Sequence, residues 1–478
     1  TNTADGEDPA RDGGPPSRSA RPCPPSAQAR RRTPIEAPTD EARDPMTRPR
    51  APRQTLTHPD AGRRPPSAEA GAPPPDAPDG PLPIALLPGD GVGPEIVEAA
   101  LLVAEAAGAG LAPETVPLPP ATDAESRAAR HEGLARVRAL GRLLKGPLAG
   151  GLSAPLRTDL SLYCHVRRAT ALAPYVPSRG PGMDVLVIRE SEEDVYCGLE
   201  SRQTADVVQC VKLVTRPAAE RFHRTAFAWA AAAGRRRVTC VTKDNVMRLS
   251  DGLFHEVFRE VAAEFPDISA DHVIVDAAAA RLAEAPESFD VIVAPNLYGD
   301  ILADLAAQMA GRPALTPSAR IGPEAAVFEP VHGTAAHIAG KGQANPSGLI
   351  LSLAKLLRHA GRIETAHLIR DAWLRTLEDG LHTPDVFRAN MSRRRVSTRA
   401  FAEAVAQRLG ERPNRLSPSA ESEPWAPPAP TVAPAPAPRP TAAGEARRLV
   451  GVDLVIADAA RDAEGLAAAL APLAPSGL

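Results

Sequence analysis

Two stretches decide the fold: VTKDNVM at residues 241–247 and NLYGDILADLAA at residues 296–307. Each stretch follows a short apolar run that is typical of a buried parallel strand. The first places Lys243 after its strand, and the second places Asp300 and Asp304 after the next one. Because ligands of parallel α/β sheets bind at the carboxyl ends of strands, we predict a functional site at this edge.

The carboxylates in this region favour a hard divalent cation. Asp300 and Asp304 are four residues apart in a helix predicted over 300–310, so both project from one face, and Asp276 follows another apolar strand. Such a cation takes oxygen ligands, and a lysine beside it, such as Lys243, can act as a base. The alternative is that Asp300 caps the helix, Asp304 favours its dipole and Lys243 is a solvated surface residue.

Three arginines form a second group: Arg157, Arg167 and Arg189, with Tyr196 seven residues after the last. Guanidinium groups match planar carboxylates, so three of them converging would select a di- or tricarboxylic acid. Taken singly, each is an ordinary surface arginine.

The loop from Glu329 to Asn345 is rich in small residues and backbone donors, as a nucleotide pocket requires. The glycine-rich segment at residues 89–93 departs from the GxGxxG spacing, and no acidic partner stands about twenty residues further on. A Rossmann dinucleotide site is therefore not predicted.

Composition sets the remaining limits. The 53 prolines crowd residues 1–83 and 413–440, which predicts disordered tails. A net charge of −3 argues against nucleic-acid binding, and no apolar stretch approaches the roughly 20 residues of a membrane helix. Five widely spaced cysteines without a CxxC pair indicate neither a disulfide framework nor a zinc site, so we expect a cytoplasmic protein.

The ordered part alternates strands with helices, which is typical of an α/β fold. We predict strands at residues 83–87, 184–188, 238–242, 272–275 and 290–294. We predict helices at residues 94–107, 218–233, 251–264 and 300–310.

Five motifs together resemble the isocitrate/isopropylmalate dehydrogenase family. They are GDGVGPE at 89–95, IRESEEDVYCGLE at 188–200, VTKDNVM at 241–247, NLYGDILADLAA at 296–307 and FEPVHGTAAHIAGKGQANPSG at 328–348. Within the family the chain is most similar to isocitrate dehydrogenases with an extra C-terminal domain, through SRQT at 201–204, LEDGLHTPDVF at 377–387 and LVGVDLVI at 449–456. The resemblance implies a two-domain α/β fold with a central cleft, distinct from the Rossmann fold.

It also implies a domain plan. We expect a disordered Pro/Ala/Arg-rich tail at 1–82, the catalytic domain at 83–412, a Pro/Ala linker at 413–441 and the truncated start of a βα domain at 442–478. The first methionine is Met46, so we expect residues 1–45 to be upstream read-through.

The resemblance implies oxidative decarboxylation of isocitrate, a step of the tricarboxylic acid cycle, in a homodimer with shared sites. Mg²⁺ or Mn²⁺ would be held by Asp300, Asp304 and the partner's Asp276. The partner's Lys243 would remove the hydroxyl proton, and Tyr196 would protonate the enolate. Substrate carboxylates would be held by Arg157, Arg167, Arg189 and Ser153. The monomer would then be inactive.

Cofactor contacts are implied for ten residues: Asn245, Glu329, His332, Gly333, Thr334, Ala335, His337, Ile338, Asn345 and Arg388. NAD users place an aspartate where His337 stands, and NADP users tend to have a lysine and a tyrosine at 337 and 338. This chain matches neither. Losing the acidic group removes repulsion of a 2′-phosphate, and Arg388 lies where NADP users can have an arginine, so we expect NADP over NAD.

The chain departs from the family pattern at three places, one of which is the stretch at residues 312–320, with less glycine than expected. About six residues are missing before Arg157, with Gly151 at a serine position and Ser153 at an asparagine position, and Arg168 replaces a proline. Two alternatives therefore stay open: a related dehydrogenase acting on isopropylmalate, homoisocitrate or tartrate, and a catalytically impaired regulatory or scaffold subunit.

Overall fold

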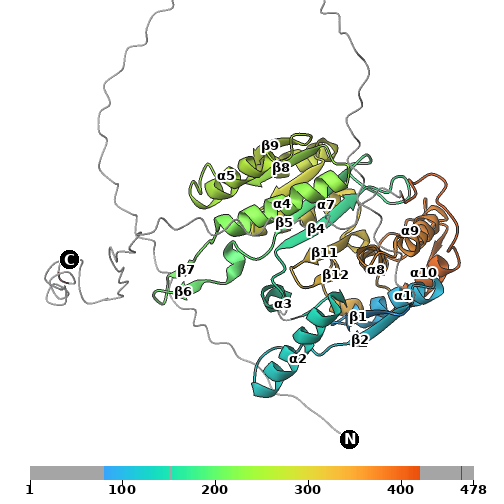
Figure 1. Cartoon of the computed structure of the whole chain (residues 1–478). Coiled ribbons are helices and arrows are strands. Elements are labelled where there is room, and N and C mark those ends of the chain that lie inside the picture. The colour runs from blue at the N-terminus through green and yellow to red at the C-terminus, as the bar shows by residue number, and fades with distance from the viewer. Residues whose placement is uncertain (1–79, 150–152, 420–464, 466–478) are drawn as a thin grey trace, which may run out of the picture. The chain divides into compact units, whose positions relative to one another are not determined.

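The structure, a computed structural model, describes residues 80–149, 153–419 and 465 (Figure 1). The expected N-terminal tail up to residue 79, the linker beyond residue 419 and the C-terminal βα unit lie outside the described residues, apart from Gly465, and Leu82, the last residue of the expected tail, begins β1. Among the residues described, no helix is both long and apolar enough to span a bilayer.

A ten-stranded mixed sheet organises the fold, in the order β2-β1-β3-β12-β11-β4-β5-β10-β8-β9. Its strands are β1 Leu82–Leu87, β2 Leu111–Thr115, β3 Arg142–Lys145, β4 Cys164–Thr170, β5 Asp184–Glu190, β8 Arg237–Thr242, β9 Ser269–Ile274, β10 Val291–Ala294, β11 Pro317–Ile321 and β12 Ala326–Pro330. This mixed order confirms the predicted α/β fold with a large central sheet and excludes a Rossmann sheet.

Pairing direction divides the sheet into two parallel blocks. β2, β1, β3 and β12 run parallel, as do β5, β10, β8 and β9, whereas β12–β11, β11–β4 and β4–β5 are antiparallel. The second block carries the predicted site residues at its carboxyl ends. Its central strand β10 is buried along its whole length, which explains its unbroken apolar sequence.

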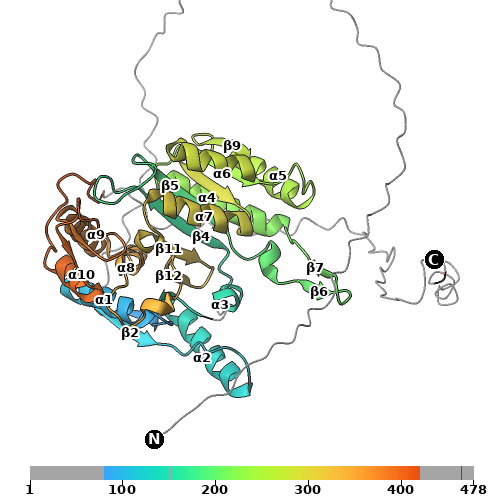
Figure 2. The ribbon, with the colours of Figure 1, turned by 180° about the vertical axis from the view of Figure 1, so that it is seen from behind.

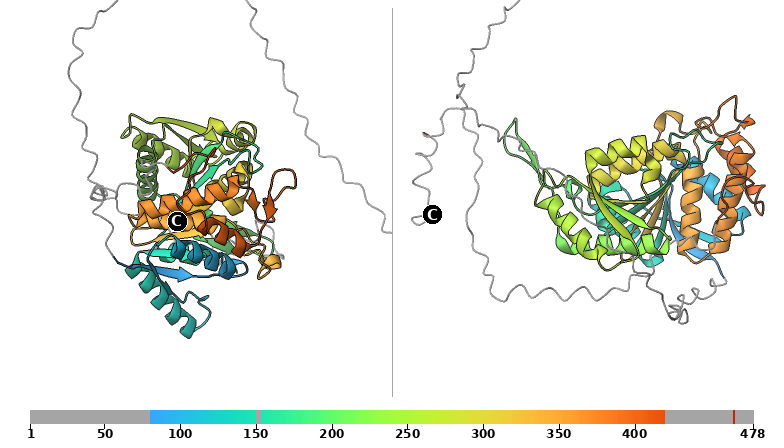
Figure 3. Two further views of the ribbon diagram at one scale, coloured as in Figure 1. Left: turned by 90° about the vertical axis from the view of Figure 1, so that its right-hand side faces the viewer. Right: turned by 90° about the horizontal axis from the view of Figure 1, so that it is seen from above.

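Helices cover both faces of each block. Around the first block, α1, α8, α9 and α10 pack on one another, and α2 packs on β1 and β3. In the second block α4 packs with α5, while α6 and α7, in front of the sheet in Figure 2, pack together, and α7 lies against β4 and β5. Figure 3 shows the same layers from the side and from above. The helices are α1 Gly93–Ala106, α2 Ala124–Leu140, α3 Ser153–Asp159, α4 Arg216–Ala232, α5 Ser250–Ala262, α6 Val275–Glu284, α7 Asn296–Ala310, α8 Ser347–His359, α9 Ile363–Glu378 and α10 Thr398–Ala406.

Shorter elements complete the chain. A two-stranded hairpin stands apart from the large sheet in Figures 1 and 2, and a second small sheet pairs residues before α10. These strands are β6 Glu200–Arg202, β7 Val208–Cys210, β13 Leu381–His382 and β14 Arg394–Arg395, and the 3-10 turns are η1 Val195–Cys197, η2 Pro286–Ser288, η3 Pro313–Leu315 and η4 Ala336–Ile338.

Most predicted helices and strands begin and end within three residues of their expected positions, but the predicted start of α7 is wrong. It begins at Asn296, four residues before the predicted start, and Pro295 occupies its N-cap position. Asp300 therefore lies in the second turn of the helix and does not cap it. The cause is the extended backbone of Pro295 at ψ 162°, after which helical geometry begins at once.

His223 on α4 gives the core a titratable group. It is fully buried, its ring lies edge-on to Phe254 and Phe258, and Nε2 is 3.1 Å from the Phe254 carbonyl oxygen. Burial lowers the pKa of His223 from 6.5 to about 3. Its contribution to stability is complete above pH 6.5 and is lost as the pH falls toward 3, because only the unfolded chain then takes up the proton.

We predict that His223→Leu flattens this acid dependence. Between pH 7.5 and 5.0 the wild-type free energy of unfolding should fall by about 2 kcal/mol more than that of the variant, measured by urea titration. The control His131→Leu, at an exposed position on α2, should keep the wild-type dependence. Equal slopes for all three proteins would contradict this role of His223.

Candidate functional site

The carboxylate of Asp300 on α7 is held by three side chains. Arg189, near the end of β5, pairs with Oδ1, and Arg167 on β4 places Nη2 3.5 Å from the same oxygen. The hydroxyl of Tyr196 donates to Oδ2 at 2.7 Å. The convergence of these residues, predicted from the sequence only as a hypothesis, is therefore present in the fold.

The first turn of α7 also holds the guanidinium group of Arg189 in place. Its Nε and Nη2 both donate to Oδ1 of Asn296, at 2.8 and 2.6 Å. The helix start is itself fixed by buried Asp194, whose Oδ2 accepts from the backbone N–H of Leu297 at 2.8 Å. Asp194 has a φ of 68°, a strained value for a residue other than glycine. Its hydrogen bond with the Leu297 N–H therefore stabilises an unfavourable backbone conformation two residues before Tyr196.

A second carboxylate extends the site toward solvent. Asp304 lies one helical turn after Asp300, and Arg167 Nη1 donates to its Oδ1 at 2.6 Å. The Asp304 side chain remains 62% exposed, compared with 32% for Asp300. Two carboxylates on one helix face with an accessible side fit a hard divalent cation, which prefers such oxygens and retains water.

Tyr196 lies between two guanidinium groups. The Cζ atoms of Arg157 and Arg189 are each 4.9 Å from the centre of its ring. Arg157 is 5% exposed, and its Nη2 has no hydrogen-bond partner among the described residues. A buried donor without a partner is costly, so this atom is placed to receive an acceptor from a ligand.

The electrostatics suit proton donation by Tyr196. Burial first, then the bond to Asp300, raises the pKa of Tyr196, so its hydroxyl stays protonated at neutral pH. For Asp300, burial alone would raise the pKa, but the charge of Arg189 and the Tyr196 bond outweigh it and lower that pKa. Burial lowers the pKa of Arg189 to about 10, so it stays charged.

Lys243 and Asp276 form a separate group. Lys243 directly follows β8, Asp276 is the second residue of α6 after β9, and the two side chains form an ion pair. Within the described ranges no ion pair joins either residue to Asp300 or Asp304. Asp276 is 68% exposed. The predicted residues are thus gathered into two half-sites, one around Asp300 and one around Lys243.

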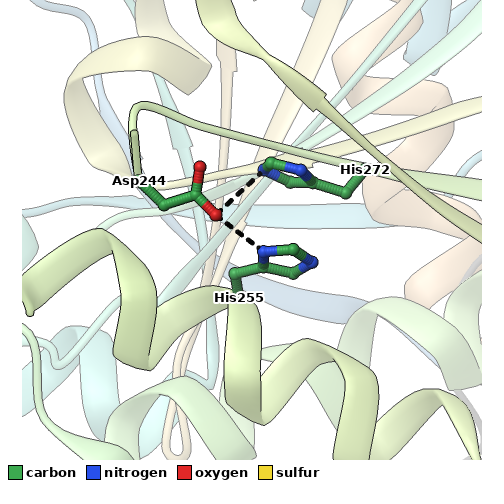
Figure 4. Close-up of side chains that lie close together, drawn as sticks. All are labelled: Asp244, His255 and His272. Atoms are coloured by element: carbon green, nitrogen blue, oxygen red, sulfur yellow. Dashed lines mark hydrogen bonds and ion pairs between the residues drawn. The ribbon is translucent and has the colours of Figure 1, made fainter. Parts of the chain in front are cut away.

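The loop that carries Lys243 is anchored by its neighbours. The Lys243 N–H donates to Oδ2 of Asp251 at 2.7 Å. Figure 4 shows the carboxylate of Asp244 beside two imidazoles, His255 on α5 and His272 on β9, and contacting both. Its Oδ2 is 2.8 Å from His255 Nδ1 and 3.7 Å from His272 Nε2. The two imidazoles stack with centroids 3.8 Å apart. This cluster was not predicted, because only the pairing of β8 with β9 brings His272 beside the loop.

The predicted nucleotide loop lies against the glycine-rich segment. The Val92 N–H donates to the Thr334 carbonyl oxygen at 2.9 Å. Gly91 has a φ of +59°, and a Cβ there would lie 2.1 Å from that oxygen, so only glycine permits this approach. His337 on η4 is exposed, as are Gly333 and Asn245, whereas Ala335 and Ile338 pack partly against the core. Nε2 of His332 is buried without a partner among the described residues.

Glu329, predicted to contact the cofactor, is buried at the end of β12 between two cations. Lys145 Nζ and Arg320 Nε each lie 2.5 Å from one of its oxygens. Burial opposes ionisation, but these charges hold the pKa of Glu329 well below its usual range. These two ion pairs join β3, β11 and β12.

The remaining predicted residues occupy different surroundings. Buried Asn345 donates to Oδ2 of Asp385 at 3.1 Å, and Arg388 Nη1 donates to the Phe387 carbonyl oxygen at 2.7 Å. Ser153 is the first residue of α3. The departure noted at Gly151 lies outside the described residues.

The residues that sequence reasoning missed are those that support the site. Asn296 and Asp194 stood inside quoted motifs, but nothing in their spacing showed that one fixes Arg189 and the other the start of α7. The partners of Glu329 could not be found either, because Lys145 lies on β3, far away in the chain, and Arg320 meets Glu329 only through the pairing of β11 with β12.

Comparison with known proteins places this geometry in context. Residues 83–405 match the family model described as "Isocitrate/isopropylmalate dehydrogenase". An isocitrate dehydrogenase [NADP] of Rickettsia bellii is 42% identical over 344 residues, covering 70% of this chain and 71% of the relative. One from Thermus thermophilus is also 42% identical, over 349 residues and 70% of each chain. The crystal structure of isocitrate dehydrogenase from Methylococcus capsulatus matches with a TM-score of 0.63 and 38% identity, covering 68% of this chain and 99% of that one.

We predict that Glu329→Gln destabilises the fold by about 3 kcal/mol, because two buried cations lose their counter-charge. Urea unfolding monitored by circular dichroism measures the loss. The matched control is Glu114→Gln, which removes an exposed partner of Arg136 and should leave the midpoint unchanged. Equal midpoints for the two variants would show that the buried network is not needed for stability.

Proposed function

The chain belongs to the isocitrate/isopropylmalate dehydrogenase family, and we propose that it oxidatively decarboxylates isocitrate to 2-oxoglutarate with reduction of NADP. It is an oxidoreductase of this family. The observation that carries the proposal is the joint contact of Arg189, Arg167 and Tyr196 with Asp300. We assign catalysis to residues 83–412 of a cytoplasmic protein.

The arginines supply the substrate's binding charges. Arg157, Arg167 and Arg189 are all buried, and desolvation strengthens their attraction for carboxylates. Nη2 of Arg157 has no hydrogen-bond partner in the part of the chain that the structure describes, whereas Arg167 and Arg189 contact the carboxylates of α7. Isocitrate carries three carboxylates, so a tricarboxylic acid fits this number of cations.

Asp300 and Asp304, with Asp276 of the partner subunit, would hold Mg²⁺ or Mn²⁺. The fit rests on two carboxylates one turn apart and on the exposure of Asp304. When bound, the cation acidifies the substrate hydroxyl and offsets negative charge after CO₂ leaves.

The chain's own groups move the protons. Lys243 of the partner subunit accepts the hydroxyl proton while the carbon gives its hydride to the nicotinamide. The bond between the adjacent carbon and its own carboxylate then breaks, CO₂ leaves and the electron pair stays on that adjacent carbon as part of an enolate. Tyr196 returns a proton to that carbon, a role supported by its raised pKa and its fixed position between two guanidinium groups.

A homodimer would unite the two half-sites. Large apolar side chains are exposed beside each of them: Val246 and Leu249 near Lys243, at 67% and 90%, and Ile301 next to Asp300, at 56%. Leu199 and Val208 add exposed apolar surface at the β6–β7 hairpin. Surface of this kind is suited to burial against a second copy of the chain.

We predict that two inactive variants complement each other. Lys243→Met and Asp304→Asn each disable one half-site, so each homodimer should lack metal-dependent turnover. After subunit exchange at equal amounts, half the dimers are hybrids with one intact site, which gives about a quarter of wild-type activity.

The control for this experiment mixes Asp304→Asn with Tyr196→Phe, which alter the same half-site and should give no recovery. Native mass spectrometry verifies exchange. If hybrids form from Lys243→Met and Asp304→Asn but turnover stays absent, shared sites are excluded.

Cofactor preference is tested at exposed His337. His337→Asp introduces a negative charge where a 2′-phosphate would bind, so kcat/KM for NADP should fall at least about tenfold while that for NAD changes little. His337→Asn is the uncharged control. An equal NADP loss in both variants would contradict a phosphate contact at this position.

A related dehydrogenase or an impaired subunit remains the second candidate, and the observation that favours it is Ser153 with the shortened loop before α3. Assays with Mg²⁺ should compare isocitrate, isopropylmalate, homoisocitrate and tartrate with each nucleotide. We expect isocitrate with NADP to give the highest kcat/KM. Absence of turnover with every pair, in a folded dimer, would favour the scaffold.

A further inference from the structure

Asp244, His255 and His272 form a group of possible metal ligands that the proposed chemistry does not use (Figure 4). We call this group the histidine cluster. Asp244 lies in the loop after β8, His255 on α5 and His272 on β9, so three consecutive parts of the chain contribute one side chain each. The ligand atoms of the three residues all lie within 4.8 Å of one another. The three side chains are therefore close enough to bind one small ion.

The sheet register holds this arrangement in place. β8 and β9 pair in parallel, with Cys240 opposite His272. Side chains two positions apart on a strand point to the same face, so Thr242 shares the face of His272, and its hydroxyl is 2.8 Å from Nε2 of that ring. The helix α5 packs on both strands, and the ring of His255 stacks on that of His272. Two of the three possible ligands thus lie on regular elements, which hold a site more precisely than loops do.

Hydrogen bonding accounts for only part of the cluster. Asp244 Oδ2 is at hydrogen-bond distance from His255 Nδ1, 2.8 Å, but its 3.7 Å separation from His272 Nε2 is too long for one. Both rings nevertheless bring a nitrogen toward this oxygen, and their planes are 16° apart. Zinc bonds of about 2.0–2.1 Å place tetrahedral nitrogen and oxygen ligands about 3.3 Å apart. Side-chain movements of about 1 Å would therefore close the cluster around such an ion.

The electrostatics of the cluster suit metal binding. Burial, followed by the charge of His255, lowers the pKa of His272, so its ring is neutral at neutral pH and keeps a lone pair. For Asp244, burial alone would raise the pKa, but the hydrogen bond with His255 and the charge of His272 outweigh it and lower that pKa. The three side chains are 19% to 22% exposed, which leaves an open side for the ion to enter and for water to complete its coordination.

We propose that the histidine cluster binds a divalent transition-metal ion of the zinc class. Two imidazole nitrogens and one carboxylate oxygen form a donor set that suits Zn²⁺ and Co²⁺, with water in the remaining position. The two carboxylates of α7 offer only oxygen, which suits Mg²⁺ or Mn²⁺. The two sites therefore differ in donor chemistry, and binding at the histidine cluster does not depend on the proposed function.

The bound ion holds the half-site around Lys243 in position. Asp244 directly follows Lys243, and His272 lies on β9, which leads into α6 and Asp276. An ion shared by the cluster joins the Lys243 loop to α5 and to the strand before Asp276. This positioning of Lys243 rests on the proposed function, whereas the binding itself does not.

Binding is measured on the full-length protein after removal of metals with a chelator. Calorimetric titration should give one Zn²⁺ per chain at this site, and Co²⁺ should develop the visible absorption bands of an ion bound by nitrogen. Loss of an outer-shell partner costs up to about 100-fold in metal affinity, so loss of a direct ligand, in His255→Gln or His272→Gln, should weaken Zn²⁺ binding at least about 100-fold. Circular dichroism verifies that the variants are folded.

Three controls separate this cluster from other places that could take the ion. His131→Gln removes an exposed imidazole on α2, and Cys210→Ser removes an exposed thiol on the β6–β7 hairpin. Asp304→Asn alters the cation site of the proposed function. Each control should keep the wild-type affinity for Zn²⁺. Because Asp304→Asn tests only the other site, failure of the proposed function and failure of this proposal give different results.

Hydrogen exchange tests the effect of the ion on the loop. Saturation with Zn²⁺ should slow amide exchange in residues 244–249 of the wild type, because the ion joins this loop to α5 and β9. In His272→Gln the same addition should leave the exchange rates unchanged. Equal slowing in both proteins would contradict the positioning of the loop by this ion.

Wild-type crystals soaked in Zn²⁺ and measured at the zinc absorption edge give a readout that needs no variant. An anomalous peak within bonding distance of Asp244, His255 and His272 supports the proposal, as does binding that is lost in both histidine variants and kept in the three controls. The proposal is overturned if Zn²⁺ does not bind saturably, or if no peak lies at the cluster. It is also overturned if Cys210→Ser or Asp304→Asn abolishes binding while the histidine variants keep it.

Discussion

The site depends on one set of contacts, those that the carboxylate of Asp300 makes with Arg189, Arg167 and Tyr196. It joins β4, β5, η1 and α7, and each partner is fixed from behind: Arg189 by Asn296, and the start of α7 by Asp194. Because a buried charge is tolerated only when it is paired, these contacts also keep the arginines charged in a mostly dry interior. The same contacts that pair the buried charges also bring two guanidinium groups and the Tyr196 hydroxyl together at Asp300.

Sheet topology decides which residues share an edge. In the block β5-β10-β8-β9 the strands are parallel, so Arg189, Lys243 and Asp276 all come at carboxyl ends. They nevertheless form two half-sites, and exposed apolar side chains lie beside both. The amino ends of these strands instead line a cavity of about 660 Å³ together with α8 and α9.

The sequence predicted features that are local or periodic. Apolar runs predicted β5, β8 and β10, and the order of motifs placed Lys243, Asp276 and Asp300 after strands. The start of α7 was wrong because the geometry of one proline, Pro295, decided it. The ion pairs of Glu329 could not be predicted, because Lys145 lies far away in the chain and Arg320 meets Glu329 only through the pairing of β11 with β12. The cavity could not be predicted for a related reason: two of its lining residues, Arg168 and Lys355, are 187 positions apart in the chain and come together only because α8 packs on β11, the neighbour of β4.

Anomalous diffraction from crystals soaked in Mn²⁺ tests the central claim most directly, since it locates the cation without relying on turnover. The account predicts one peak per chain within bonding distance of Asp300, Asp304 and Asp276 of the partner subunit. A principal peak at Asp244, His255 and His272, or coordination by Asp276 without Asp300 and Asp304, would contradict it.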